Sequence, residues 1–164
     1  MNLFTAAAVA GRDHGVRANI QWGGEFLAFR LGDREYGLDV LNVQEIRSYE
    51  QPARLANAPC FVKGVVNLRG TIVPIVDLRI RLGCEGAEYN ALTVVIVLNV
   101  KGRVLGAVAD SVCDVLELPP TAIEAAPDVA SQHGASVISG TVCVGDRRLT
   151  LLDAEALFAD PHLS

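Results

Sequence analysis

Apolar and polar residues alternate along much of the chain with the two-residue period that is typical of β-strands. Residues 25–31 form one alternating segment, and a Gly-Asp pair at 32–33 separates it from a second one at 34–38. Glycine at the first position of a two-residue loop favours a type II′ turn, so these residues predict a β-hairpin. Alternating segments joined by Lys-Gly and Gly-Asp pairs predict two more hairpins, over residues 93–109 and 137–152.

Four further segments have the composition of strands. They are residues 43–49, 62–67, 71–76 and 112–118, and a Leu-Arg-Gly turn joins the second segment to the third. Pro74 lacks an amide proton, which predicts either an edge strand or a β-bulge at its position. About ten short strands separated by turns are typical of small barrels and sandwiches, so the sequence predicts a mainly all-β fold.

Helix signals are few and short. A capping residue precedes three short segments: Asp77 before 78–82, Thr121 before 122–126 and Asp153 before 154–159. None of these helices is long enough for a βαβ crossover, which disfavours parallel strands. The first and last hairpins share a Gly-Asp turn followed by arginine, and this similarity is equally consistent with a duplicated lobe and with chance.

Composition narrows the classes of function. The chain has 164 residues, of which 51% are hydrophobic, and its formal net charge is −5. No basic face of the kind that contacts a nucleic-acid backbone is visible, so nucleic-acid binding is not expected. The longest apolar run, residues 92–100, is too short to cross a bilayer, and residues 1–20 predict a loosely ordered, flexible arm and no signal peptide. We therefore expect a cytoplasmic protein.

The residues that usually perform catalysis or bind metals are dispersed. The sequence has no nucleophile elbow, phosphate-binding loop or dinucleotide fingerprint. The cysteines form no CxxC pair and lie in or beside apolar stretches, so we predict small buried residues in a reducing compartment at Cys60, Cys84, Cys113 and Cys143. Neither enzyme activity nor a metal or other cofactor is expected. Non-enzymatic β modules of this kind commonly bind other proteins through edges and grooves.

Several strings occur in the order in which the CheW family of chemotaxis coupling proteins carries them. The most specific string runs from Asn67 to Leu82 and reads NLRGTIVPIVDLRIRL. A second string, GDREYG, occupies residues 32–37, and a third, VQEIR, occupies residues 43–47. Over residues 24–159 the chain resembles this family without a large insertion.

The resemblance implies two small SH3-like β-barrel lobes packed together, with an additional core between them and a few short helices, over residues 21–160. A tail follows at 161–164. It further implies a non-catalytic scaffold without cofactors, which binds the cytoplasmic tip of chemoreceptors and the regulatory domain of the histidine kinase CheA. Such adaptors lie in receptor arrays at the inner face of the membrane. Because the chain ends soon after the last predicted helix, we expect a free-standing adaptor.

Two alternatives stay open. The first is an adaptor of the same family that serves another pathway, such as surface motility or second-messenger signalling. The second is a small-molecule-binding β-barrel, which a large apolar pocket with converging polar groups would favour.

The resemblance assigns receptor binding to Val43, Glu45, Gly64 and Arg69. Val43 and Glu45 are two residues apart and are therefore expected on one face of a strand, while Arg69 is expected on an exposed turn. We predict that the four residues form one patch in a groove between the lobes, and that Glu45 pairs with Arg69. Gly64 has a second interpretation, in which backbone geometry alone requires the glycine.

The resemblance assigns kinase binding to the region around Glu124 and Val129. Family members carry a basic residue and an aromatic residue where this chain has Glu124 and Val129. We therefore predict a mostly apolar contact with the kinase at this place.

Overall fold

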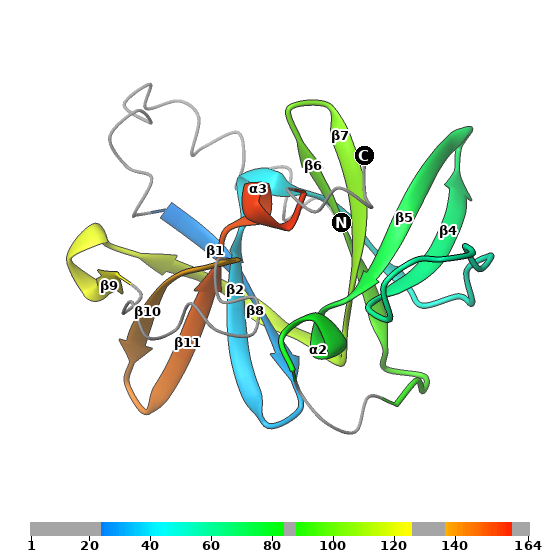
Figure 1. The fold of residues 1–164 in the computed structure, drawn as a ribbon. Helices are drawn as coiled ribbons and strands as arrows, with labels where there is room; N and C mark the ends of the chain where they lie inside the picture. The colour runs from blue at the N-terminus through cyan, green and yellow to red at the C-terminus, as the bar shows by residue number, and fades with distance from the viewer. Residues whose placement is uncertain (1–23, 84–87, 126–136, 159–164) are drawn as a thin grey trace.

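Two β-sheets make up two lobes of the protein (Figure 1). The computed structural model describes residues 24–83, 88–125 and 137–158, so the predicted arm at 1–20 and the tail at 161–164 lie outside the described residues. Within these ranges the chain forms eleven strands: β1 (Gly24–Leu31), β2 (Arg34–Asp39), β3 (Val43–Ser48), β4 (Val62–Leu68), β5 (Thr71–Asp77), β6 (Val94–Val100), β7 (Arg103–Ala109), β8 (Ser111–Leu118), β9 (Ile123–Ala125), β10 (Ile138–Val144) and β11 (Arg147–Leu152).

The sheet order intertwines the two lobes along the chain. The six-stranded lobe has the order β8-β1-β2-β11-β10-β9, and the five-stranded lobe has the order β3-β6-β7-β5-β4. The chain therefore begins in the six-stranded lobe, builds the five-stranded lobe and returns through β8. The predicted mainly all-β fold of two lobes is confirmed.

Each sheet contains one parallel pair, which corrects the expectation that parallel strands are disfavoured. Strand β5 runs parallel to β7, with Ile75 opposite Gly106, and β11 runs parallel to β2, with Leu149 opposite Glu35. In neither pair are the two strands consecutive in the chain. Intervening strands make the return connection, so no long crossover helix is required.

The two similar hairpins do not mark two lobes. The first hairpin, β1–β2, and the last, β10–β11, lie in the same six-stranded sheet. In the strand order, the hairpin that occupies the place of β1–β2 in the other sheet is β6–β7. Each of these two hairpins contributes one strand to the parallel pair of its sheet.

Turn geometry agrees with the turn residues. Gly32 has a φ of +67° and Asp33 has no positive φ, as the predicted type II′ turn requires. Between β4 and β5 the turn is shorter than predicted, because Leu68 already pairs with Thr71 in the ladder. Arg69 and Gly70 form this two-residue turn, with φ values of 51° and 91°.

Pro74 lies on an interior strand, so the edge-strand prediction is wrong. Its partner across β4 is Val65, whose N–H and C=O bond to Ala53 at 2.8 Å and 2.9 Å on the opposite side. The parallel pairing of β5 with β7 begins only at Ile75. The missing amide proton of Pro74 therefore costs no ladder hydrogen bond. The alternative, a β-bulge, occurs on the partner strand between Val62 and Gly64.

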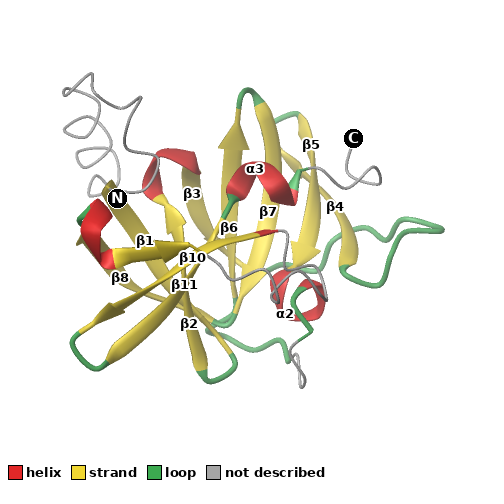
Figure 2. Ribbon diagram, turned by 60° about the vertical axis from the view of Figure 1, so that its left-hand side comes forward, coloured by secondary structure: helices red, strands yellow, loops and turns green. Residues whose placement is uncertain are grey.

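Two of the three predicted short helices are present. The helix α2 (Leu78–Arg81) begins where the Asp77 carboxylate accepts from Arg79 N at 3.0 Å, and α3 (Ala154–Leu157) begins where Asp153 accepts from Glu155 N at 3.0 Å. The helix predicted after Thr121 is wrong. A 3-10 turn, η3 (Pro120–Ala122), leads directly into β9, because Ile123 to Ala125 pair with β10. A second 3-10 turn, η2 (Val40–Asn42), joins β2 to β3 (Figure 2).

The core has three parts, and β1 contributes to two of them. Leu27 and Phe29 face an inter-lobe core, while Phe26 and Ala28 face the core of the six-stranded lobe. Strand β6 divides in the same way: Ile96 and Leu98 go to the inter-lobe core, and Val95 and Val97 to the core of the five-stranded lobe. Each buried Leu or Phe contributes about 1.5–3 kcal/mol. The additional core between the lobes is thus confirmed, and it explains the many aliphatic residues.

The prediction of buried cysteines is wrong for the three that the structure describes. Cys60, Cys113 and Cys143 are all exposed, and Cys84 lies outside the described residues. Cys113 is the extra residue of a β-bulge where β8 shifts register against β1. An apolar neighbourhood in sequence therefore does not imply burial, because a bulge or strand alternation turns single positions outward.

Candidate functional site

Glu45 and Arg69 form an ion pair that joins β3 to the turn between β4 and β5. Arg69 Nη2 donates to Glu45 Oε2, and Arg47 Nη1 lies 3.5 Å from Glu45 Oε1. The side chain of Arg69 is 64% exposed and that of Glu45 is 26% exposed. The pairing predicted between these residues is therefore confirmed, and most of the Arg69 side chain remains exposed.

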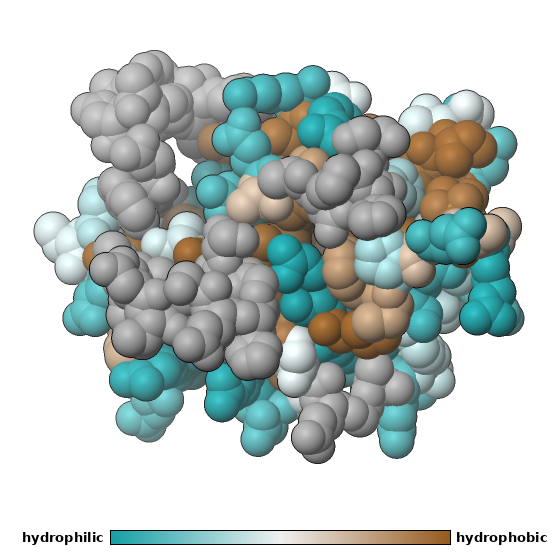
Figure 3. All heavy atoms as spheres, viewed as in Figure 1, coloured by the Kyte–Doolittle hydropathy of each residue, from teal (hydrophilic) through white to brown (hydrophobic). Residues whose placement is uncertain are grey.

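The local fold explains why Arg69 projects outward. Asn67 Oδ1 accepts from Gly70 N at 2.8 Å and so closes the turn. Arg69 occupies a left-handed position, where its φ of 51° sends the side chain away from the strand ladder. Next to it, Ile72 is 59% exposed, and Figure 3 shows apolar atoms gathered over this end of β4 and β5. The tip thus offers a cation beside an apolar surface.

Val43 and Glu45 do not share a face of β3, so this prediction is wrong. The register of β3 against β6 shifts between them: Val43 opposes Leu98, and Glu45 opposes Val97. Leu98 belongs to the inter-lobe core and Val97 to the core of the five-stranded lobe. The extra residue of this bulge, Gln44, reverses the alternation, and Val43 therefore packs against the inter-lobe core.

The backbone conformation and the close approach of Ala53 require a glycine at position 64. Its φ is +141°, and a Cβ atom there would lie 2.0 Å from the carbonyl oxygen of Ala53. This supports the interpretation from backbone geometry. Of the four predicted residues, the structure brings Glu45 and Arg69 together. Val43 lies on the opposite face of β3 and Gly64 is buried beside Ala53, so the four do not form one patch in a groove between the lobes.

The electrostatics of the pair favour its charged form. The hydrogen bond from Arg69 holds the pKa of the Glu45 carboxyl below its ordinary value, and desolvation opposes this only in part. The Arg69–Glu45 pair therefore stays ionised at neutral pH. Its exposed position makes it sensitive to salt and to the charge of a partner.

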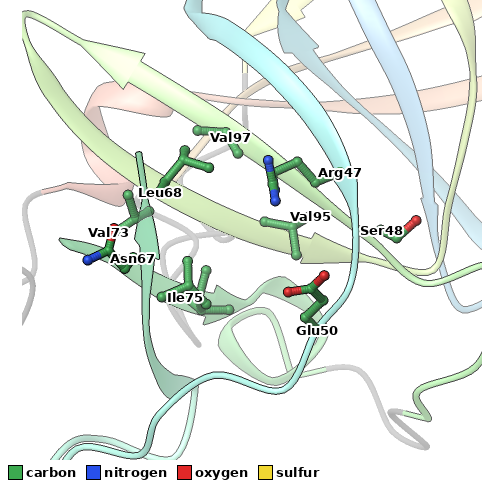
Figure 4. A pocket seen from close by; sticks show the side chains of 10 residues that line it. Arg47, Ser48, Glu50, Asn67, Leu68, Val73, Ile75, Val95 and Val97 are labelled. Carbon is green, nitrogen blue, oxygen red and sulfur yellow. The ribbon is translucent and has the colours of Figure 1, made fainter. Parts of the chain in front are cut away.

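A small cavity opens between β3, β4, β5 and β6 (Figure 4). Its floor consists of core residues such as Leu68 and Val95, and Arg47, Glu50 and Asn67 lie at its rim. The cavity volume is about 50 Å³. Sites for small organic ligands usually measure about 300–1,000 Å³, so this barrel interior is filled by its own side chains.

The predicted kinase contact lies on the other lobe. Glu124 is exposed on β9, the edge strand of the six-stranded sheet, where it opposes Thr141. Val129 lies outside the described residues. Glu124 therefore lies on the six-stranded lobe, whereas the Arg69–Glu45 pair lies on the five-stranded lobe.

A buried charge network, which the sequence did not reveal, lies in the same motif as Arg69. Arg79 is 1% exposed, and its Nε and Nη2 donate to the two Asp77 oxygens, each at 2.9 Å. Its Nη1 donates to Asp110 Oδ1 at 2.6 Å and to the Glu88 carbonyl at 2.5 Å. Tyr89 OH also donates to Asp77. An arginine at a strand-to-helix junction flanked by aliphatic residues is the signal that could have indicated its burial.

Asp110 extends this network to the six-stranded lobe. It follows β7 and precedes β8, at the point where the chain passes between lobes. Its Oδ2 accepts from Gly32 N at 2.5 Å, and its backbone N–H donates to the Arg30 carbonyl at 3.0 Å. The crossover residue is therefore bonded to both lobes.

No group of side chains in the described ranges has the composition and spacing of a metal site. Among the same residues there is no helix long and apolar enough to span a membrane.

Two interlocked β lobes, with an exposed charged turn on one and the exposed Glu124 on the last strand of the other sheet, are typical of a protein-binding β module. A CheW-like domain matches residues 25–162, and the chain belongs to the CheW-like family of chemotaxis scaffold proteins. The chemotaxis protein CheW of Klebsiella aerogenes is 49% identical over 142 residues, covering 87% of this chain and 86% of that protein.

More distant relatives agree with this family. The chemotaxis protein CheW of Rhizobium meliloti is 38% identical over 136 residues, covering 83% of this chain and 88% of that protein. The crystal structure of the scaffolding protein TtCheW from Thermoanaerobacter tengcongensis superposes with a TM-score of 0.78 at 25% identity, covering 85% of this chain and 95% of that one.

Proposed function

We propose that the protein couples chemoreceptors to the histidine kinase CheA in a chemotaxis array, as a cytoplasmic adaptor that performs no catalysis itself. In this function the five-stranded lobe binds the cytoplasmic tip of the receptor and the six-stranded lobe binds the regulatory domain of the kinase. The Arg69–Glu45 pair supports the proposal, because it presents an exposed, oriented guanidinium in the motif that is most specific to the family.

The proposed receptor contact centres on Arg69 and Glu45. A guanidinium with one bound carboxylate keeps donors for a carboxylate or carbonyl of the partner. The exposed Ile72 beside it adds apolar area to the contact. Val43 and Gly64 contribute to this site indirectly, Val43 by packing β3 on the inter-lobe core and Gly64 by keeping β4 close to Ala53.

The proposed kinase contact centres on β9 and the segment that follows it. Glu124 is exposed on this edge strand, and the apolar Val129 follows five positions later in the sequence. Because the two contacts lie on different lobes, one adaptor can bind receptor and kinase at the same time.

Binding of the purified protein to a receptor cytoplasmic fragment and to the kinase regulatory domain tests the proposal. We expect Arg69→Glu to lose receptor binding and keep kinase binding, and Val129→Asp to do the reverse, since it introduces an unpaired charge into an apolar contact. Both variants should keep the wild-type circular dichroism spectrum. If the folded variants keep both interactions, or if each of them loses both, the assignment of receptor and kinase to different lobes is wrong.

A further inference from the structure

We propose that the groove between Tyr49, Leu55, Lys63 and Tyr89 is a third interaction surface, which binds an acidic segment of a protein partner that carries apolar side chains. The groove goes beyond the proposed function, because it includes neither Arg69 nor Glu124. Its volume is about 530 Å³, roughly ten times that of the cavity in the barrel.

Apolar and aromatic side chains form part of the groove wall, beside polar and charged ones. The rings of Tyr49 and Tyr89 lie 4.6 Å apart between centroids, and Pro52, Leu55 and Pro59 line the groove from the segment that precedes β4. Leu55 is 45% exposed and Tyr89 is 39% exposed. Exposed aromatic and aliphatic side chains around a concave surface are typical of sites where a partner inserts a side chain.

The charge of the groove is positive in a chain whose net charge is −5. Among the residues that the structure describes, the lining contains Arg54 and Lys63 and no carboxylate; Glu50 and Glu88 are neighbours in sequence but are not part of it. Lys63 Nζ lies 5.9 Å from the centroid of the Tyr89 ring, so the cation and the aromatic wall form one unit. A partner segment with a carboxylate beside an apolar side chain matches both features.

The buried network prepares the aromatic wall for binding. Tyr89 OH donates to Asp77, and the Arg79 guanidinium lies 4.8 Å from the Tyr89 ring centroid. Burial, and next the hydrogen bond to Asp77, raise the pKa of Tyr89, so its phenol remains a proton donor. One hydrogen bond and one cation–π contact thus hold an exposed ring in place, which lowers the ordering entropy that binding would otherwise cost.

A protein segment fits this groove better than a small anion does. The two cations share the groove with the side chains of Tyr49, Leu55 and Tyr89, which a phosphate ion would leave uncovered. A peptide can cover the apolar side chains and at the same time place a carboxylate against Lys63.

Titration by amide NMR tests the inference without the receptor or the kinase, so its failure is distinct from failure of the proposed function. Three probes are compared: a short peptide that alternates glutamate and leucine, its glutamine counterpart and inorganic phosphate. We expect the acidic peptide to shift the amide signals of Lys63 and Tyr89 in a saturable way, and the other two probes to shift them much less.

Charge variants complete this test. Arg54→Glu with Lys63→Glu should weaken binding of the acidic peptide by about tenfold or more, whereas Arg148→Glu, at an exposed arginine on β11, should leave it unchanged. Equal shifts with both peptides, no shift at these signals, an equal shift with phosphate alone, or full binding by the folded double variant would overturn the inference.

Discussion

Arg69 and Arg79 come from one motif, yet they lie in opposite environments. The Arg69 side chain is 64% exposed and pairs with Glu45, whereas the Arg79 side chain is 2% exposed and bonds to Asp77, Asp110 and the Glu88 carbonyl. An exposed pair is screened by water and salt and contributes little to folding. A buried pair depends on every partner, because an unpaired charge in the interior is costly. The difference indicates that Arg79 maintains the fold and Arg69 remains available for a partner.

The largest effect is expected at the buried arginine. Arg79→Met leaves the carboxylates of Asp77 and Asp110 without their main donor, and should lower the free energy of unfolding by about 3–5 kcal/mol. Denaturant unfolding measures this loss, and Arg69→Met serves as the matched control with nearly unchanged stability. Equal losses in the two variants would remove the distinction between the arginines.

A pH-dependent effect should follow from the carboxylate of the same network. Burial acts to raise the pKa of Asp77, but hydrogen bonds from Arg79 and Tyr89 outweigh it and hold the pKa below its ordinary value. The stability that Asp77 contributes is therefore fully present above its unfolded pKa of about 3.9, and is lost as the pH falls through the folded value.

Unfolding measured from neutral to acidic pH should show this loss in the wild type. Asp77→Asn should be less stable at neutral pH, and its deficit relative to the wild type should shrink as the pH falls. Glu45→Gln should change the profile less, because the Arg69–Glu45 pair is exposed. If the stability difference between Asp77→Asn and the wild type does not change with pH, the Asp77 carboxylate is not the source of the pH dependence.

A smaller effect should appear in the salt dependence of receptor binding. Exposed charges are screened over about 10 Å at 0.1 M salt, so added salt should weaken the contact that Arg69 makes. Binding of the receptor fragment by Arg69→Met should be weaker at low salt and less dependent on salt than binding by the wild type. Isothermal titration at several ionic strengths measures both slopes, and equal slopes would exclude a charge contact through Arg69.

The smallest effect is expected from chelator and reductant. Neither should shift the melting temperature, because Cys60, Cys113 and Cys143 are free and the described residues hold no metal-ligand group. A large shift with chelator would indicate a structural metal, and one with reductant would indicate a disulfide.

Local sequence patterns predict much of this fold. Gly32 identifies the first hairpin, because a positive φ is required there, and Asp77 and Asp153 identify two helix starts through their capping hydrogen bonds. The pairing of Glu45 with Arg69 was also predictable, since two of the strings that resemble the family place opposite charges on a strand and on a turn. These signals depend only on neighbouring residues or on a short motif.

Features that depend on distant strands could not be predicted in this way. The bulge at Gln44 reverses the faces of Val43 and Glu45, and its cause is the register of β3 against β6. The parallel pair of β2 and β11 forms when the chain returns to the six-stranded lobe, and that of β5 and β7 forms across the intervening β6, and periodicity records neither. Arg79 also bonds to Asp110, which lies far from it in the sequence and comes near it through the pairing of β5 with β7.

A charge-swap cycle across Glu45 and Arg69, read out as affinity for the receptor cytoplasmic fragment, tests the central claim most directly. We predict that Arg69→Glu and Glu45→Arg each fold normally and lose receptor binding, and that the double variant recovers part of the loss because the pair forms again in reverse. Single variants that keep the wild-type affinity would contradict the claim that this pair is the receptor contact. Loss in both single variants without recovery would show that each side chain contacts the receptor independently of the pair.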